Sequence, residues 1–172
     1  TKDAGREWEE RMNGMKEVHI VTAIAINPKD PSVLYGGTTG GIYRSEDGAM
    51  SWKKINTGLI PESELMASMA LGVNAIEIDR INPDIVYAGT TKGLYRTSNK
   101  GESWERIAQS ITEPYISSIV LHPGDSSVLY AGGPGGVWKS ADGGRTWAAT
   151  NQGLSTLNIR ALPMEPKNLR TL

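Results

Sequence analysis

The sequence contains no cysteine and no phenylalanine among its 172 residues. Without cysteine the chain has no disulfide, no thiol nucleophile and no thiolate metal ligand. The formal net charge is −1 and both signs are mixed along the chain, which argues against a nucleic-acid or anionic-membrane surface built on charge. No apolar run approaches the length of a membrane span. The missing cysteine fits a reducing cytoplasm and an exported bacterial protein equally well.

Glycine and proline are present in quantity, with counts of 20 and 9. The repeated segments described below show no apolar period of an amphipathic helix, whereas short alternating apolar runs are frequent. Such a composition suits many short strands joined by tight turns. The chain is long enough to bury a real core, so the sequence predicts an all-β fold.

One segment occurs three times without a gap, as Val21 to Trp52, Val73 to Trp104 and Ile116 to Trp147. Each copy ends in a variant of Ser-x-Asp-x-Gly-x-Thr-Trp, which we call the box. A box also stands at residues 1–8, and the first part of a further copy stands at residues 159–172. Self-similarity at a fixed period predicts structural units that stack side by side.

Each copy divides into four short strands. In the first copy they are expected at Val21 to Ile26, Ser32 to Tyr35, Ile42 to Ser45 and from Trp52 onward, with turns at Asn27 to Pro31 and in the box, and with Gly36 to Gly41 as a glycine-rich loop or tight reversal. Both faces of the first strand are apolar or small, as expected for a strand buried on both sides. Four antiparallel strands in a period of about 43 residues are typical of a propeller blade. A solenoid is the competing architecture, but its units are usually shorter or helical.

The four boxes, TKDAGREW, SEDGAMSW, TSNKGESW and SADGGRTW, resemble the Asp-box, or bacterial neuraminidase repeat. They depart from it at Thr1, Thr97, Asn99 and Ala49, and Ala49 is strained if its site needs a positive φ. The resemblance implies a β-propeller of three complete four-stranded blades with partial blades at both ends. In style the chain is most similar to xyloglucanase-type glycoside hydrolases, sortilin-like domains and the photosystem II assembly factor propellers.

The whole chain, residues 1–172, is therefore expected to be part of a single propeller domain. Within it we expect an outer strand and connector at 1–17, a blade at 18–55, an inserted connector at 56–72, blades at 73–107 and 115–150, and the start of another blade at 158–172. This division leaves open sheet edges, which proteins normally close or cover. We expect remaining blades or another chain to complete the propeller.

The box residues are expected to serve the fold. A short side-chain acceptor such as Asp47 or Asp142 can take backbone N–H groups of a tight turn, glycine supplies the left-handed conformation, and the tryptophan covers the turn. The resemblance places the boxes at the blade periphery, and a catalytic group would not recur once per blade. The residues assigned this structural role are Asp3, Trp8, Asp47, Trp52, Asn99, Trp104, Asp142 and Trp147.

Function in repeat proteins tends to lie where the repeat is broken. The first break is the inserted connector, in which Pro61 to Leu71 is typical of a short helix. The connector is either a loop packed on the blade edge or a lip over the propeller face that contacts a ligand. Its candidate binding residues are Glu62, Glu64, Met66 and Met69, which mix charge with soft apolar contact.

Two inner-strand residues also break the repeat. Glu77 stands where the other copies have Ala25, Val120 and Pro163, and Arg160 stands where they have Thr22, Asn74 and Ser117. Glu77 is expected to face the channel, as a binding or acid/base group, or to be a solvated structural residue paired with Arg80 or Arg160. Arg160 near the axis is a candidate for binding a carboxylate. His19 and His122 lie far apart in the repeat, so no metal site and no cofactor are predicted.

The expected working face carries the blade connectors and the turns between second and third strands, where Lys92 and Tyr115 are further candidates. The favoured function is a non-catalytic scaffold or binding propeller for protein or glycan, extracytoplasmic, with no nucleic-acid partner and no membrane span in this segment. The alternative is a xyloglucanase-type glycoside hydrolase that cleaves β-glucan with paired carboxylates.

Overall fold

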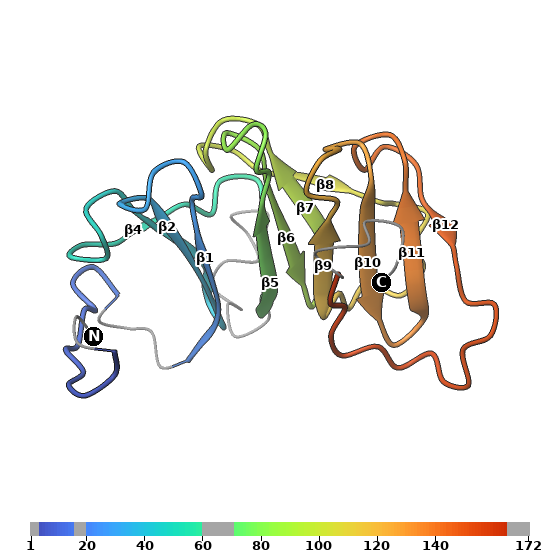
Figure 1. The fold of residues 1–172 in the computed structure, drawn as a ribbon, viewed down its shortest axis with the longest axis horizontal. Helices are drawn as coiled ribbons and strands as arrows, with labels where there is room; N and C mark the ends of the chain where they lie inside the picture. The colour runs from blue at the N-terminus through green and yellow to red at the C-terminus, as the bar shows by residue number, and fades with distance from the viewer. Residues whose placement is uncertain (1–3, 16–19, 60–70, 165–172) are drawn as a thin grey trace.

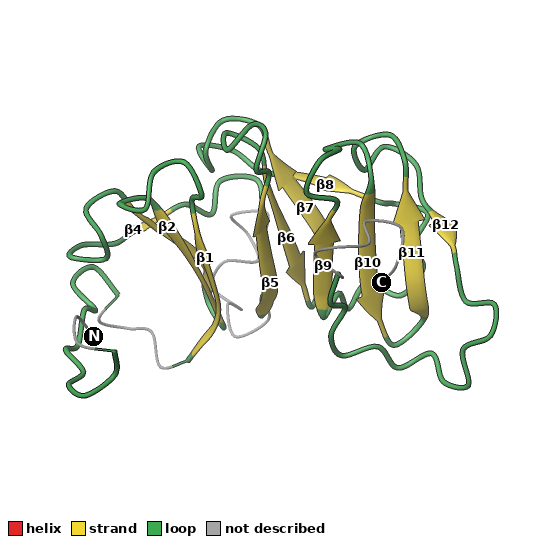
Figure 2. Ribbon diagram, in the orientation of Figure 1, coloured by secondary structure: helices red, strands yellow, loops and turns green. Residues whose placement is uncertain are grey.

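The computed structural model describes residues 4–15, 20–59 and 71–164 of the chain. These residues form three four-stranded antiparallel sheets that stand in a row (Figure 1). Figure 2 shows that every regular element among them is a strand. Each sheet is a simple meander in chain order, as the sequence predicts for three complete blades.

The strands fall at equivalent places in the three repeats. The first blade contains β1 (Val21–Ile26), β2 (Leu34–Thr38), β3 (Gly41–Ser45) and β4 (Lys53–Lys54); the second contains β5 (Val73–Ile78), β6 (Val86–Thr90), β7 (Gly93–Thr97) and β8 (Glu105–Ile107); the third contains β9 (Ser118–Leu121), β10 (Leu129–Gly133), β11 (Gly136–Ser140) and β12 (Ala148–Ala149). Their shortness is typical of propeller blades.

The glycine-rich stretch of each repeat is mostly strand, which corrects the expected loop from Gly36 to Gly41. Strand β2 continues through Gly37 to Thr38, and β3 begins at Gly41. A Cβ atom on Gly37 would lie 2.8 Å from Val73 Cγ1, so glycine here allows the next blade to approach closely. The Thr38 hydroxyl closes the short turn, because it donates to Gly41 O at 2.9 Å and accepts from Gly40 N at 3.0 Å.

The hydrophobic core lies between adjacent sheets. Ile76 and Ile78 of β5 are buried in a cluster that includes Ala23 and Ala25 of β1. The second cluster repeats this packing between Ala75 and the apolar residues of β9. In β1 the equivalent isoleucines, Ile24 and Ile26, are 63% and 56% exposed. Burial on both faces is therefore wrong for β1, because no sheet among the described residues covers that side.

A side-chain hydrogen bond joins each inner strand to the next blade. Thr22 donates to Val73 O, Asn74 Nδ2 donates to Ile116 O at 2.9 Å, and Ser117 Oγ donates to Ile159 O at 2.5 Å. The strand pairing shifts register between Val21 and Ala23 and again between Val73 and Ala75. Such a β-bulge re-aims a side chain, so it turns Thr22 and Asn74 toward the neighbouring blade.

Two further contacts repeat farther out along the blades. The hydroxyls of Tyr35 and Tyr87 donate to the box carbonyls of Lys100 and Gly143 in the next blade, at 3.2 and 3.3 Å. At the outer edge, the indole N–H groups of Trp52 and Trp104 donate to Arg11 O and Ile55 O, at 3.0 and 2.8 Å. Their backbone N–H groups donate to Asn13 O and Thr57 O, both at 2.8 Å. We call this pair of tryptophan hydrogen bonds to the preceding connector the tryptophan latch.

The segments at the two ends of the described chain lack strand pairing. The outer strand expected near Trp8 to Met12 does not form a ladder, although residues 11 and 13 accept the latch of Trp52. Residues 158–164 run beside β9 and β10, since Ile159 N donates to Gly133 O of β10 and Leu162 N donates to Ser118 Oγ of β9, both at 3.0 Å. The predicted helix at Pro61 to Leu71 lies outside the described residues except for Leu71, which is buried and bridges to Gly40.

Candidate functional site

The box turns are built from side-chain hydrogen bonds and two successive left-handed residues. In the first blade Asp47 Oδ1 accepts from Ser51 N at 2.9 Å, and Ser45 Oγ accepts from Ala49 N at 2.9 Å. Ala49 has φ 70°, so the site does need a positive φ and alanine is strained there. Asn99 replaces the carboxylate in the second blade with the same acceptor geometry, since its Oδ1 accepts from Ser103 N at 3.0 Å.

Asp47 and Asp142, the box carboxylates among the described residues, are held ionised by hydrogen bonds of this kind. The side-chain hydrogen bond from Ser51 is the main cause that lowers the pKa of Asp47 to about 2, and Thr146 lowers the pKa of Asp142 to about 2 in the same way. A carboxyl group with so low a pKa is a poor general acid at neutral pH. The described box side chains therefore stabilise turns, because they accept hydrogen bonds from backbone N–H groups of the same turn.

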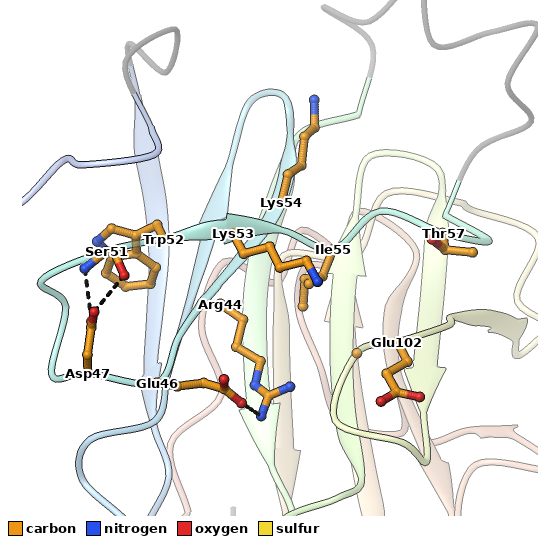
Figure 3. Close-up of a pocket in the computed structure, with 11 residues that line it drawn as sticks. Arg44, Glu46, Asp47, Ser51, Trp52, Lys53, Lys54, Ile55, Thr57 and Glu102 are labelled. Carbon is orange, nitrogen blue, oxygen red and sulfur yellow. Dashed lines mark hydrogen bonds and ion pairs between the residues drawn. The ribbon is translucent and has the colours of Figure 1, made fainter.

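A groove of about 730 Å³ lies at the outer edge between the first two blades. Figure 3 shows Asp47 bonded to Ser51 and Arg44 bonded to Glu46 on its wall, with Lys53 and Lys54 on the strand above. Arg44 and Glu46 thus pair within the blade. The groove follows the outer edge of the blade, and its box carboxylate, Asp47, already accepts hydrogen bonds from Ser51.

A second hollow, of about 490 Å³, has the features of a binding site. It lies where β5, β9 and the 158–164 segment begin, at the end of the blades opposite the boxes. Its lining residues are Asn74, Tyr115, Ser117, Pro134, Asn158, Ile159 and Arg160. They come from the start of β5, the approach to β9, the turn between β10 and β11, and the segment beside β9. We call this the rim hollow.

The rim hollow combines a cation, two carboxamides, a hydroxyl and an aromatic ring. Arg160 is exposed and Tyr115 is 42% exposed. Asn74 and Ser117 are fixed there by their bonds to the next blade. Among the described residues, no carboxylate lines the hollow. The site therefore has groups that bind a polar ligand but no acid/base pair.

The rim hollow brings together two of the predicted residues, Tyr115 and Arg160. Lys92 lies on the turn between β6 and β7, half-buried, and is not part of its wall. Four candidates of the inserted connector, namely Glu62, Glu64, Met66 and Met69, and also Asp3 of the first box, lie outside the described residues. The binding roles of the candidate residues and the structural role of Asp3 stay predictions.

Glu77 lines a different groove, of about 260 Å³, between the inner strands β1 and β5. Burial raises the pKa of Glu77 to about 7, and the positive charge of Arg80 opposes the rise only in part. Arg80 lines the same groove, whereas Arg160 lines the rim hollow. Glu77 thus supplies the one carboxyl group among the described lining residues of its groove, and its raised pKa lies near neutral pH.

The sequence did not single out Asn74, Ser117 or Asn158 as site residues. Asn74 and Ser117 occupy the same repeat position as Arg160, so the register alone was enough to group them. Asn158 carries no such signal, because only the path of the segment beside β9 brings it to the hollow.

Residues 4–15, 20–59 and 71–164 contain no group of three metal-binding side chains, and they contain no helix that could cross a membrane. These two observations concern the described part of the chain alone.

Curated proteins with detectable sequence similarity are xyloglucanases. The oligoxyloglucan-reducing end-specific xyloglucanase of Emericella nidulans is 29% identical over 106 residues, which are 60% of this chain and 12% of that protein. This chain therefore matches only a small part of the length of that relative. No protein-family model matches the chain.

Solved structures of several kinds share the fold. The extracellular domain of a one-component system protein from B. thetaiotaomicron matches with a TM-score of 0.70 and 18% identity, over 92% of this chain and 21% of that one. An ancestral GH74 enzyme matches with 0.64 and 20%, over 80% and 19%. YCF48 bound to D1 peptide matches with 0.58 and 13%, over 83% and 44%. Identities this low show the fold alone.

The three meandering sheets and these likenesses show that the chain has a β-propeller fold, as predicted. They agree with the resemblance to bacterial neuraminidase-repeat propellers. The neighbours include a GH74 enzyme, an extracellular domain of a one-component system and a peptide complex, so the fold by itself does not define an activity.

Proposed function

We propose that this chain is part of a non-catalytic β-propeller that binds a protein segment or a glycan at the rim hollow. The observation that carries the proposal is the composition of that hollow. Arg160, Tyr115 and two carboxamides meet there in about 490 Å³, and its described lining residues include no carboxylate. A mostly polar hollow with one exposed aromatic ring suits recognition better than acid/base catalysis.

The groups of the hollow offer three kinds of contact to a ligand: hydrogen bonds, an apolar surface and a positive charge. The carboxamides of Asn74 and Asn158 offer both donors and acceptors, which peptide groups and sugar hydroxyls equally require. The exposed ring of Tyr115 gives an apolar face for a side chain or a sugar ring. Arg160 adds a fixed positive charge with several donors.

The known likenesses support both halves of this proposal without choosing between them. One structural neighbour is a complex with a peptide, and the curated relatives act on an oligosaccharide. An extracytoplasmic location is part of the proposal, since one neighbour is an extracellular domain.

Direct binding measurements test the rim hollow. We expect the parent chain to bind members of a peptide array or a xyloglucan oligosaccharide array, and Tyr115→Ala and Arg160→Ala each to weaken that binding at least about tenfold. Arg145→Ala is the matched control, because Arg145 is an exposed cation of the third box, away from the hollow. Equal binding by all four proteins would rule out the hollow.

The inserted connector is the second part of the proposed surface. We expect deletion of residues 62–70 to leave the three sheets intact, as measured by circular dichroism, and to reduce binding of the same array ligand. A deletion that binds as tightly as the parent would restrict the surface to the rim hollow.

A second candidate is xyloglucan hydrolysis, which two observations favour. The similarity to a xyloglucanase covers 106 residues, and the pKa of Glu77 near 7 suits a general acid. Hydrolysis needs a second carboxyl group across the scissile bond, which the described lining of the Glu77 groove lacks. Release of reducing ends from xyloglucan by the parent, abolished by Glu77→Gln, would replace the first proposal with this one.

A further inference from the structure

We propose that Asn13 is a site of spontaneous covalent modification, at which the side-chain amide is lost and isoaspartate forms in the backbone. The reacting groups are the carboxamide of Asn13 and the backbone N–H of Gly14. The site lies at the tryptophan latch of Trp52, because Asn13 O accepts the hydrogen bond of Trp52 N. The modification therefore also alters how residues 4–15 hold the first blade.

The reaction needs only these two residues and water. The Gly14 nitrogen attacks the Cγ atom of Asn13, and the carboxamide nitrogen leaves as ammonia together with the proton of the Gly14 N–H group. The product is a cyclic succinimide, in which the nitrogen joins Cγ to the main-chain carbonyl carbon of residue 13. Water that opens the ring at Cγ gives aspartate. Water that opens it at the main-chain carbonyl carbon gives isoaspartate, whose peptide bond runs through Cγ.

Glycine after the reacting residue favours ring closure, because it has no Cβ atom to hinder the approach of its nitrogen. Three described residues with a suitable side chain precede glycine, namely Asn13, Asp47 and Asp142. In the two boxes the following nitrogens, of Gly48 and Gly143, each donate to a serine carbonyl at 2.9 Å. The box carboxylates also accept hydrogen bonds within their turns. The two aspartate sites are therefore protected at both reacting groups.

Both reacting groups are free at Asn13. Residues 12–15 form a turn that Met15 N closes by donating to Met12 O at 2.8 Å. Gly14 has φ 90°, which is typical of the third residue of a type II turn. Asn13 and Gly14 are exposed, and among the described residues neither the Asn13 carboxamide nor the Gly14 N–H group has a hydrogen-bond partner. No hydrogen bond must break before the ring can close.

The equivalent turn between the first and second blades shows that this exposure does not depend on the neighbouring blade. Thr57 and Gly58 stand there at the positions of Asn13 and Gly14, and Thr57 O accepts from Trp104 N at 2.8 Å. Both residues are exposed although a described blade lies on each side of them. The turn thus faces outward from a complete junction, where water reaches it.

The other described asparagines lack at least one of the features of Asn13. Asn27 and Asn82 precede proline, which has no N–H group to attack the side chain. Asn158 precedes Ile159, whose nitrogen donates to Gly133 O at 3.0 Å. The remaining four use their side-chain nitrogen as a donor to a backbone or hydroxyl oxygen; they are Asn56, Asn74, Asn99 and Asn151.

Isoaspartate at position 13 changes the latch, because the acceptor atom itself is rebuilt. Trp52 N donates to Asn13 O at 2.8 Å, and the Cβ position of Gly14 lies only 2.0 Å from Trp52 O. In isoaspartate the accepting oxygen becomes part of a free carboxylate, and the chain to Gly14 is longer by a methylene group. The close approach of Gly14 to Trp52 is therefore lost. Ordinary aspartate adds the charge but keeps the backbone and the acceptor.

Peptide mapping of the folded chain after timed incubation at mildly alkaline pH tests the site. We expect the peptide with Asn13 to exchange NH₂ for OH at least about tenfold faster than the peptide with Asn99, and fragmentation by electron transfer to identify isoaspartate. Asn13→Gln is the matched control, because its additional methylene group slows ring closure. In urea the Asn99 peptide should react faster, whereas the Asn13 rate should change by less than about threefold. An Asn13 that reacts in urea but stays intact in the folded chain would overturn the proposal.

The indole N–H resonance of Trp52 in an ¹⁵N spectrum tests the effect on the latch. We expect this resonance to shift as isoaspartate accumulates, while that of Trp104, whose latch uses Ile55 and Thr57, stays in place. Freshly prepared Asn13→Asp should leave the Trp52 resonance close to that of the parent, which separates the rebuilt backbone from the added charge. A Trp52 resonance that does not move in the isoaspartate form would overturn the link between the modification and the latch.

Discussion

The junction between the first and second blades differs from the junction between the second and third at its outer edge. At the first, Asn56 and Gly58 shape the connector, and Trp104 donates its indole N–H to Ile55 O. At the second, Ala108 and Ser110 stand at those two positions. The indole of Trp147 donates to Gly144 O of its own box, at 3.0 Å.

The inner parts of the two junctions are alike. Thr22 and Asn74 both reach the first carbonyl of the next blade, and Tyr35 and Tyr87 both reach the next box. The comparison shows that the inner hydrogen bonds and the tryptophan latch are separable. The latch accompanies glycine in the connector, Gly14 or Gly58, while the inner bonds need only a short polar side chain at the bulge.

The largest effect is expected from Trp104→Ala. Truncating a buried tryptophan should lower the free energy of unfolding by about 3–5 kcal/mol. Trp147→Ala is the matched change at the other junction and should cost clearly less, because Trp147 is half-buried and bonds within its own box. Urea denaturation of the two variants measures the difference, and equal losses would contradict the separate roles of the two tryptophans.

A smaller loss is expected from Gly58→Ala. The added Cβ atom meets the Trp104 carbonyl in a conformation that disfavours side chains, so we expect about 2–3 kcal/mol of destabilisation. Ser110→Ala changes the equivalent position of the second junction and should alter stability by less than about 0.5 kcal/mol. Thermal and urea denaturation provide the comparison, and a neutral Gly58→Ala would show that the latch does not need glycine.

The Glu77 carboxyl should give the second blade a pH-dependent stability. Its folded pKa, near 7, is above the ordinary value of 4.5, so the native state binds more protons and loses stability as pH rises from 4.5 to 7. Because the group is partly exposed, we expect a loss of only about 1–2 kcal/mol. Glu77→Gln should remove this slope in urea titrations at pH 5 and pH 8, and the exposed Glu102→Gln should leave it unchanged.

The smallest effect is expected from Ser110→Gly, which brings the second junction closer to the first. Glycine favours the left-handed connector but adds flexibility, so the net change should be within about 0.5 kcal/mol. The informative readout is the indole N–H resonance of Trp147 in an ¹⁵N spectrum. A shift toward that of Trp104 would indicate a gained latch, and an unchanged resonance would show that glycine at this position is not sufficient for one.

Much of the architecture was predictable because repetition exposes it. Three gapless copies and the boxes gave the blades, their order and the paired turns, since each box needs an acceptor at Asp47, Asn99 or Asp142. Local pattern was misleading at Gly36 and Gly37. Glycines usually indicate a loop, but here they continue β2, because the neighbouring blade approaches too closely for a side chain. That reason is a contact between residues far apart in the sequence.

The candidate site was only partly predictable. Arg160 stood out as a departure from the repeat and Tyr115 as a connector residue of the expected working face, while Asn158 joins them only through the path of the segment beside β9. The sequence by itself determined the blade plan, the turn chemistry and the small or apolar residues of the inner strands, because each depends on neighbours along the chain. The tertiary structure decided which tryptophans latch, why the pKa of Glu77 is raised and which residues line the rim hollow, because burial and distance between blades are properties of the assembled sheets alone.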